Sequence, residues 1–259
     1  MKRTAIVTGA YGAIGKSIAE GVASAGYNLV MVGRNEAALL QCRDELVRST
    51  GNHDISYRVV DLSRKQQVEE FSLSWDGPLH ILINNAAATP RSRLETPEGI
   101  EMQFATNVLG YLWMALFFRD HMAGLDDARV VNVASYWAGD MDMNDLEFRV
   151  RRYNNDTAYR QSKQANRMLT RALVPVLGEK GIFVLAAHPG DVNSRLSNNL
   201  GYGGWESPEQ GASTPLFCAL DPSLKGVSGK YFEHKKEVSC PFAADQEAVK
   251  RLLKICMGY

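Results

Sequence analysis

A tyrosine and a lysine stand four residues apart in the stretch TAYRQSKQAN (157–166), which contains neither glycine nor proline. On an α-helix this spacing places Tyr159 and Lys163 on the same face. A free phenol has a pKa of about 10, and a neighbouring ammonium group stabilises the phenolate and lowers that value. The pair therefore predicts a general acid–base that moves a proton between a carbonyl oxygen and an alcohol. Taken alone, the spacing fits an ordinary polar pair on a surface helix equally well.

A glycine-rich stretch, TGAYGAIGK (8–16), links a short apolar run to a segment with apolar residues at helical spacing. Gly9, Gly12 and Gly15 permit a tight turn and let backbone N–H groups approach a pyrophosphate at the N-terminus of the following helix. A strand before the turn and a helix after it are the context that a dinucleotide site requires. The stretch therefore predicts a bound dinucleotide, and a plain turn is the alternative.

The residues after the second apolar run distinguish between NAD and NADP. An acidic residue there would accept hydrogen bonds from the adenosine ribose of NAD, but the sequence reads VGRNE, with Gly33, Arg34 and Asn35. Arg34 lies 19 residues beyond Gly15, where a guanidinium can bind a 2′-phosphate through two hydrogen bonds. We therefore expect NADP(H), with a solvated arginine at a strand end as the alternative. Asp61 either contacts the adenine edge or is the N-cap of the helix that follows it.

Apolar runs and segments of helical period alternate along the chain. Repeated β–α units indicate an α/β fold with a doubly wound parallel sheet and helices on both faces, the Rossmann fold. Because no linker, repeat or low-complexity segment divides the chain, we expect one domain over residues 1–259. The predicted strands are 4–9, 28–33, 55–60, 80–85, 128–135 and 182–187, and the predicted helices are 16–26, 35–51, 64–75, 98–121 and 157–179.

Two stretches, 136–156 and 188–207, are long for loops. Each follows the carboxyl end of a predicted strand, where open α/β sheets bind their ligands, and long structured loops there are more often functional than idle. Their large side chains either line an apolar pocket or anchor the loops in the core, and the sequence favours neither. These side chains are Trp137, Met141, Leu196, Tyr202 and Trp205.

The composition excludes several classes of protein. Lys plus Arg and Asp plus Glu are both 29, so no basic field recruits nucleic acid or an anionic membrane. The four cysteines show no pairing pattern, and neither His121 nor His188 has a second ligand at metal-binding spacing, so we expect no metal site. The N-terminus runs directly into a strand, and the apolar run 111–118 is too short to cross a bilayer. We therefore expect a cytoplasmic protein without a membrane span.

Short motifs in order along nearly the whole chain resemble those of the short-chain dehydrogenase/reductase family. TGAYGAIG matches the motif TGxxxGxG, with Ala13 at its middle glycine, and we expect the neighbouring Gly12 to supply the flexibility lost there. NNAA (84–87) matches NNAG with Ala87 in place of glycine, and HPGDVNS (188–194) matches PGxVxT with Ser194 in place of threonine.

The same resemblance implies a catalytic tetrad of Asn107, Ser135, Tyr159 and Lys163, which stand in ATNVLG, VNVAS and YRQSK. It implies that Lys163 also holds the nicotinamide ribose and that Asn107 supports a water that relays protons to it. We expect Ser135 to bind the substrate oxygen and stabilise charge that develops on it. The predicted cofactor-binding residues are Thr8, Gly9, Tyr11, Gly12, Ala13, Ile14, Gly15, Arg34, Asn35, Asp61, Leu62, Asn84, Asn85, Ala86, Tyr159, Lys163, Pro189, Gly190, Val192 and Ser194.

The gap of 24 residues between Ser135 and Tyr159, together with HPG and GKYF (229–232), is similar to the retinol dehydrogenase and WW-domain oxidoreductase branch of the family. The chain has no WW domain and no N-terminal anchor of the kind many retinol dehydrogenases carry, which argues against retinoids as substrates. We expect an NADP-dependent oxidoreductase that reduces the aldehyde or ketone of a small, lipophilic partner molecule.

Two other functions stay open at this stage. One is an NADP-binding sensor or scaffold without catalysis, against which the complete set of Ser135, Tyr159 and Lys163 argues. The other is reduction of an activated C=C bond, which the tetrad does not exclude. Whether the chain forms a homo-oligomer is also left open by the sequence.

Overall fold

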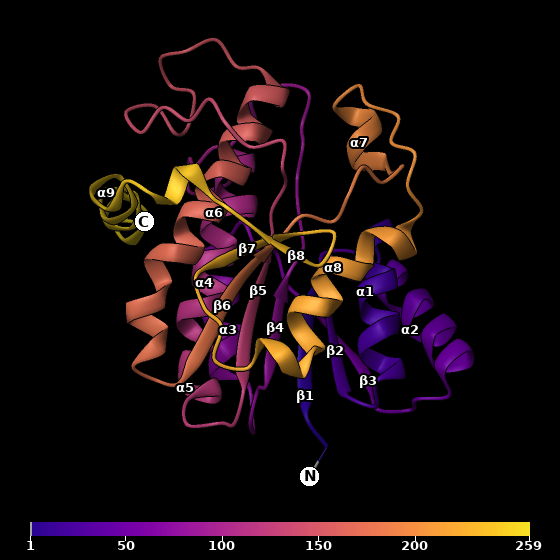
Figure 1. Cartoon of the computed structure of the whole chain (residues 1–259). Helices are drawn as coiled ribbons and strands as arrows, with labels where there is room; N and C mark the ends of the chain where they lie inside the picture. Colours follow the sequence, from indigo (N-terminus) through magenta and orange to yellow (C-terminus); the bar gives the residue numbers. More distant parts are fainter. Residues whose placement is uncertain (1) are drawn as a thin grey trace.

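Within residues 2–259, which the computed structural model describes, eight strands form one sheet flanked by helices (Figure 1). The strands are β1 (Thr4–Thr8), β2 (Asn28–Gly33), β3 (Ile55–Val59), β4 (Ile81–Asn84), β5 (Ala128–Val133), β6 (Ile182–Ala187), β7 (Lys230–Glu233) and β8 (Lys236–Val238). The helices are α1 (Ala13–Ser24), α2 (Glu36–Thr50), α3 (Lys65–Leu73), the π-helix η1 (Phe104–Leu109), α4 (Gly110–Phe117), α5 (Arg119–Met122), α6 (Asn155–Gly178), α7 (Arg195–Asn199), α8 (Pro208–Leu220) and α9 (Gln246–Met257), with 3₁₀ turns η2 (Pro222–Leu224) and η3 (Pro241–Ala243).

The strand order is β3-β2-β1-β4-β5-β6-β7-β8. Each neighbouring pair from β3 to β7 in this order is parallel. β1 lies between β2 and β4, so the chain reverses its direction of growth at this strand. Ligands of doubly wound sheets bind beyond the carboxyl ends of the strands at such a point. The predicted fold class is confirmed, with one departure, because β8 is antiparallel to β7 at the sheet edge.

The central strands β1, β4, β5 and β6 are buried on both faces because helices cover both, whereas the edge strands β3 and β8 are more exposed. On β1 the side chains of Ala5 and Val7 pack with α1, α2 and α8, while Ile6 packs with α3, α4 and α6 on the opposite face. This alternation separates two apolar clusters and explains why these strands read as continuous apolar runs. Burial on both faces fixes the strand ends that carry the candidate site.

The helix predicted over 98–121 is largely confirmed, but the chain does not form one regular helix there. The chain there makes a β-bridge between Glu95 and Glu101, then the π-helix η1, and then α4 and α5. The apolar spacing of this segment is set by burial on several sides, so it does not reveal where the backbone changes its hydrogen-bond pattern. Among residues 2–259 no helix is both long and apolar enough to cross a membrane.

Candidate active site

Helix α6 and the end of β5 bring three of the predicted catalytic residues together. The side chain of Asn154 accepts a hydrogen bond from the N–H of Thr157 at 3.0 Å and so begins α6. One turn apart on this helix, the Lys163 ammonium lies 5.6 Å from the centre of the Tyr159 ring. Ser135 lies two residues beyond the end of β5 and forms a side-chain hydrogen bond with Tyr159. The predicted proximity of Tyr159 and Lys163 is therefore present in the structure.

The protonation of this pair differs from the prediction. Burial raises the pKa of Tyr159 well above its ordinary value, and only the hydrogen bond from Ser135 works in the opposite direction. Burial also lowers the pKa of Lys163 to about 7, so its ammonium is only partly present beside the phenol at neutral pH. Its Nζ donates to the carbonyl oxygen of Val133 at 2.7 Å instead of to a carboxylate. The protein by itself therefore holds Tyr159 as a neutral phenol, which is the form that donates a proton.

Asn107 lies in the π-helix η1 and is fully buried. Its Oδ1 accepts from the N–H of Ala88 at 2.8 Å, and its Nδ2 donates to the carbonyl oxygen of Ala88 at 3.1 Å and to Oγ of Ser162 at 3.2 Å. The side chain thus ties the segment after β4 to α6 beside Lys163. π-helical turns occur frequently at functional sites, and this one positions a residue of the predicted tetrad.

A cavity of about 530 Å³ extends from the glycine-rich turn after β1 to Tyr159 and Lys163. Gly9 has a left-handed φ of +65°, and a Cβ on Gly15 would lie 2.1 Å from the carbonyl oxygen of Gly9. These two glycines are therefore required by the turn. Gly12 has φ −74°, which any residue adopts, and the compensation for Ala13 by Gly12 stays a prediction. The predicted residues that line this cavity are Gly9, Tyr11, Gly12, Ala13, Ile14, Gly15, Arg34, Asp61, Leu62, Asn85, Ala86, Tyr159, Lys163, Pro189 and Ser194.

The remaining predicted cofactor residues lie outside this cavity. Oγ1 of buried Thr8 accepts from the N–H groups of Asn85 and Ala86 at 2.9 and 3.1 Å, so Thr8 shapes the wall from behind. Asn84 donates to Oδ1 of Asn132 at 3.0 Å and joins β4 to β5. Asn35 caps α2 by accepting from the N–H of Ala38 at 3.0 Å. Thr8, Asn84 and Asn35 therefore hold neighbouring segments of the fold in place and do not line the cavity. Gly190 and Val192 line a second, neighbouring cavity.

The walls of the first cavity fit a dinucleotide. No side chain caps the N-terminus of α1 among the described residues, so its first N–H groups are open to a phosphate. At the end of β2, Nη1 of Arg34 lies 4.0 Å from Oδ2 of Asp61, and 55% of the Arg34 side chain is exposed. Asp61 is not the N-cap of α3, since that residue is Arg64; it instead accepts from the N–H and hydroxyl of Ser63.

The second cavity, of about 210 Å³, opens beside Ser135 and Tyr159. Four of the five large side chains from the long loops line it, whereas Met141 packs against the core; the four are Trp137, Leu196, Tyr202 and Trp205. Asp191, which the sequence left unexplained, also lines this cavity and accepts a hydrogen bond from the Tyr136 hydroxyl at 3.0 Å.

Neither histidine singled out in the sequence has metal ligands around it. Nδ1 of buried His188 accepts from the N–H of Tyr136 at 3.4 Å, and burial lowers its pKa to about 4. Nε2 of His121 lies 3.2 Å from the carbonyl oxygen of Ser72. In the described range 2–259, no three His, Cys, Asp or Glu side chains gather in a geometry that holds a metal ion. Both histidines therefore bond to the backbone of a neighbouring segment.

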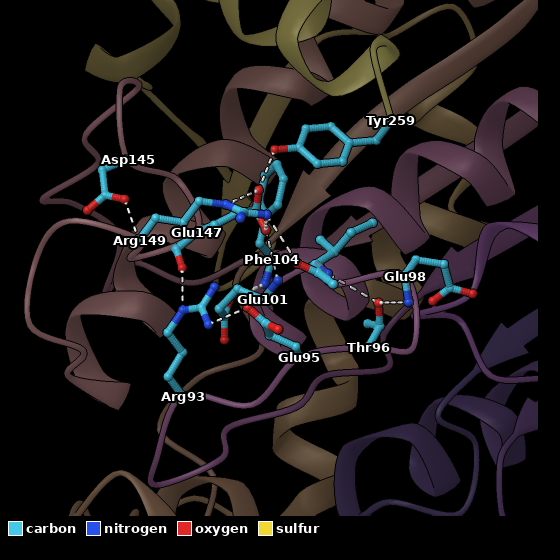
Figure 2. A network of polar contacts seen from close by, with 12 residues as sticks. Arg93, Glu95, Thr96, Glu98, Glu101, Phe104, Asp145, Glu147, Arg149 and Tyr259 are labelled. Atoms are coloured by element: carbon cyan, nitrogen blue, oxygen red, sulfur yellow. Dashed lines mark hydrogen bonds and ion pairs between the residues drawn. The ribbon is translucent and has the colours of Figure 1, made fainter.

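Sequence reasoning missed a network of carboxylates that supports η1 (Figure 2). The Glu101 carboxylate accepts from the N–H groups of Gln103 and Phe104 at 2.9 and 2.7 Å, just before η1. Glu147, from the first long loop, accepts from the N–H of Glu101 at 3.1 Å and from the Tyr259 hydroxyl at 2.7 Å. Burial raises the pKa of Glu101 to about 7. Nothing in the spacing of these residues distinguishes them from solvated charges in loops.

Comparisons with known proteins agree with this geometry. The family model described as short chain dehydrogenase matches residues 3–203. Retinol dehydrogenase 13 of Homo sapiens is 34% identical over 275 residues, which cover 96% of this chain and 82% of that protein. A solved structure of an uncharacterized protein from Mycobacterium paratuberculosis is 26% identical, with a TM-score of 0.81, and covers 99% of this chain and 92% of that one. A 3-oxoacyl (acyl-carrier-protein) reductase from Agrobacterium tumefaciens, solved with NADP bound, has the same fold at a TM-score of 0.69 and 22% identity, over 89% of this chain and 92% of that one.

Proposed function

The chain belongs to the short-chain dehydrogenase family, near its retinol dehydrogenases, and on that premise we propose that it reduces the carbonyl group of a small lipophilic molecule with NADPH. The observation that carries this proposal is the meeting of the two cavities at Tyr159, beside Ser135 and Lys163. A cavity for a dinucleotide and a cavity for a second molecule thus share one proton donor. The similarity to a protein named retinol dehydrogenase supports chemistry between an alcohol and a carbonyl.

In the proposed reaction the residues of this chain handle the proton and the charge. The cofactor supplies a hydride to the carbonyl carbon when it is bound. The neutral phenol of Tyr159 donates its proton to the carbonyl oxygen, and the Ser135 hydroxyl donates a hydrogen bond to the same oxygen. Lys163 lies behind Tyr159 and, when protonated, stabilises the phenolate that this transfer leaves. Asn107 holds the segment after β4 in place through Ala88.

The preference for NADPH rests on the end of β2. Arg34 is half-exposed at the rim of the first cavity. Its Nη1 lies 4.0 Å from Oδ2 of Asp61, which is the outer limit for an ion pair. Such an exposed ion pair contributes little stability, so Arg34 is free to bind a 2′-phosphate.

The apolar walls of the second cavity support a lipophilic substrate. The chain's four free cysteines support a reducing compartment, and we place the protein in the cytoplasm.

The experiment that tests this function compares Tyr159→Phe with a matched control, Tyr57→Phe. Tyr57 lies on β3 outside both cavities, and its hydroxyl donates to Oε1 of Glu36 at 3.3 Å. General acid catalysis typically contributes about 10²–10⁴-fold to a reaction rate. Tyr159→Phe should therefore lower kcat for the reduction of an aldehyde or ketone by roughly that factor. Binding of NADPH, followed by its fluorescence, should barely change, and the control should match the wild type in both measurements.

Two results would contradict the proposal. The first is a Tyr159→Phe variant that keeps wild-type turnover, which would assign the proton transfer to another group. The second is a wild-type protein that binds NADPH but oxidises it with none of a panel of aldehydes and ketones.

A further inference from the structure

The second cavity has an aromatic wall. The ring centres of Trp137 and Tyr202 are 4.4 Å apart, and those of Tyr136 and Trp137 are 6.0 Å apart. Trp205, which is 79% exposed, completes the rim of the same cavity. The faces of aromatic rings carry negative partial charge, and an aromatic wall attracts a cation that lies against it.

Two of these rings are made more electron-rich by their hydroxyl groups. The Tyr136 hydroxyl donates to Oδ2 of Asp191 at 3.0 Å, and the Tyr202 hydroxyl donates to Oδ1 of Asp156. A phenol that donates to a carboxylate gains electron density in its ring, since the shared proton leaves more charge on the oxygen. Both tyrosine faces of the wall therefore attract a cation more strongly than a free phenol would.

The formal charge on the cavity wall is negative. Of the residues in the range 2–259 that line the cavity, Asp191 alone carries a full charge at neutral pH, and its Oδ1 accepts no hydrogen bond from those residues. The carboxylate of Glu206 accepts from the N–H of Asp191, which places a second negative group directly behind the wall. On α6, Arg160 forms an ion pair with Asp140 at 2.6 Å. Arg195 lines the neighbouring first cavity rather than this one. The cavity is therefore a place where an anion is repelled and a cation is stabilised.

We propose that this cavity binds a cationic group of the substrate, namely a quaternary or protonated amine attached to an otherwise lipophilic carbonyl compound. The assignment names the substrate class of the proposed reductase and rests on that function for the position of the carbonyl group at Tyr159. A cation beside Asp191 also neutralises a charge that otherwise raises the pKa of Tyr159, so it favours formation of the phenolate during proton transfer.

The test uses two molecules of one shape and different charge, 3-(trimethylammonio)phenol and 3-tert-butylphenol, titrated into the full chain by isothermal calorimetry. The cation should bind about tenfold more tightly than its neutral counterpart, as cation–π and ionic attraction together provide. Asp191→Asn should weaken binding of the cation by about fivefold to tenfold and leave the neutral phenol within about twofold. Asp126→Asn is the matched control, because Asp126 is exposed, pairs with Lys225 at 2.6 Å and lies outside the cavity.

A second variant keeps the test decisive if Asp191→Asn disturbs its loop. Trp205 is largely exposed, so Trp205→Leu removes a π face without opening the core, and it should weaken only the cation, by about threefold. The proposal is overturned if the neutral phenol binds as tightly as the cation, if neither binds at millimolar concentration, or if Asp191→Asn and Trp205→Leu weaken both molecules equally. Because the readout is binding without turnover, its failure leaves the Tyr159→Phe experiment intact, and a failure of that experiment leaves the preference for cations measurable.

Discussion

Replacing Lys163 by methionine removes an ammonium group that folding carries into the interior, so we expect the variant to be more stable than the wild type. Lys163 is 2% exposed, and burial lowers its pKa from 10.5 to about 7. A tenfold change in proton affinity is worth about 1.4 kcal/mol, so this burial destabilises the folded protein by about 5 kcal/mol. Loss of the hydrogen bond to the Val133 carbonyl oxygen destabilises the variant by about 1–3 kcal/mol, and methionine fills a volume similar to that of lysine. The net gain should be roughly 2–4 kcal/mol.

The gain has a pH dependence that identifies its cause. The folded pKa of about 7 is below the unfolded value of 10.5, so between these pH values the unfolded chain binds a proton that the folded protein has released. The destabilisation by Lys163 is therefore complete below about pH 7 and disappears as the pH rises toward 10.5. Between pH 7 and pH 9 the advantage of the variant in free energy of unfolding should shrink by about 2 kcal/mol.

Urea unfolding of the ligand-free protein, followed by circular dichroism at pH 7 and pH 9, measures both quantities. Lys250→Met is the control, because the Lys250 side chain is 72% exposed and its pair with Glu247 lies on the surface of α9. This control should change the free energy of unfolding by less than about 0.5 kcal/mol. A Lys163→Met variant that is no more stable than the wild type at pH 7, or whose advantage is the same at pH 9, would refute the reasoning.

Three other predictions concern the cofactor cavity. NADPH should bind at least about tenfold more tightly than NADH, and Arg34→Ala should remove most of that preference in fluorescence titrations; equal affinities in the wild type would contradict it. Gly15→Ala places a Cβ 2.1 Å from the Gly9 carbonyl oxygen, so calorimetry should show a loss of roughly 1–3 kcal/mol of stability and weaker NADPH binding. An unchanged variant would show that the turn adapts. Residues 193–207, which include Gly201 and Gly204 at positive φ, should gain hydrogen-exchange protection when NADPH binds, and identical protection in both states would exclude a closing lid.

The strands were predictable because their burial on both faces is written into local sequence. Strand β2 occupies the predicted residues 28–33, and α2 falls within the predicted 35–51, with Asn35 as its N-cap and Gly51 at its end in the left-handed conformation. The arrangement at Tyr159 was equally predictable, since helical spacing alone sets which side chains share a face. Where a local rule decides the geometry, the sequence is sufficient.

What the sequence did not reveal depends on contacts between distant segments. The charge state of Lys163 follows from its burial under β5, not from its neighbours on the helix. Glu101 and Glu147 are 46 residues apart, and only the folded chain joins the carboxylate of one to the backbone of the other. The region after residue 207 was not assigned at all; β7 and β8 are too short to show a clear alternation, whereas α9 has buried residues at helical spacing and was predictable.

The hydrogen bond from Tyr259 to Glu147 has a consequence for the order in which the protein matures during synthesis. The first six strands and α6 have all emerged from the ribosome well before residue 259, and their local contacts allow the sheet to form. The loop that carries Glu147, however, gains its last partner only when the ring of Tyr259 packs at 5.3 Å against Phe104. The last contact that holds the Glu147 loop against the residues before η1 is therefore made by a residue synthesised after every strand of the sheet.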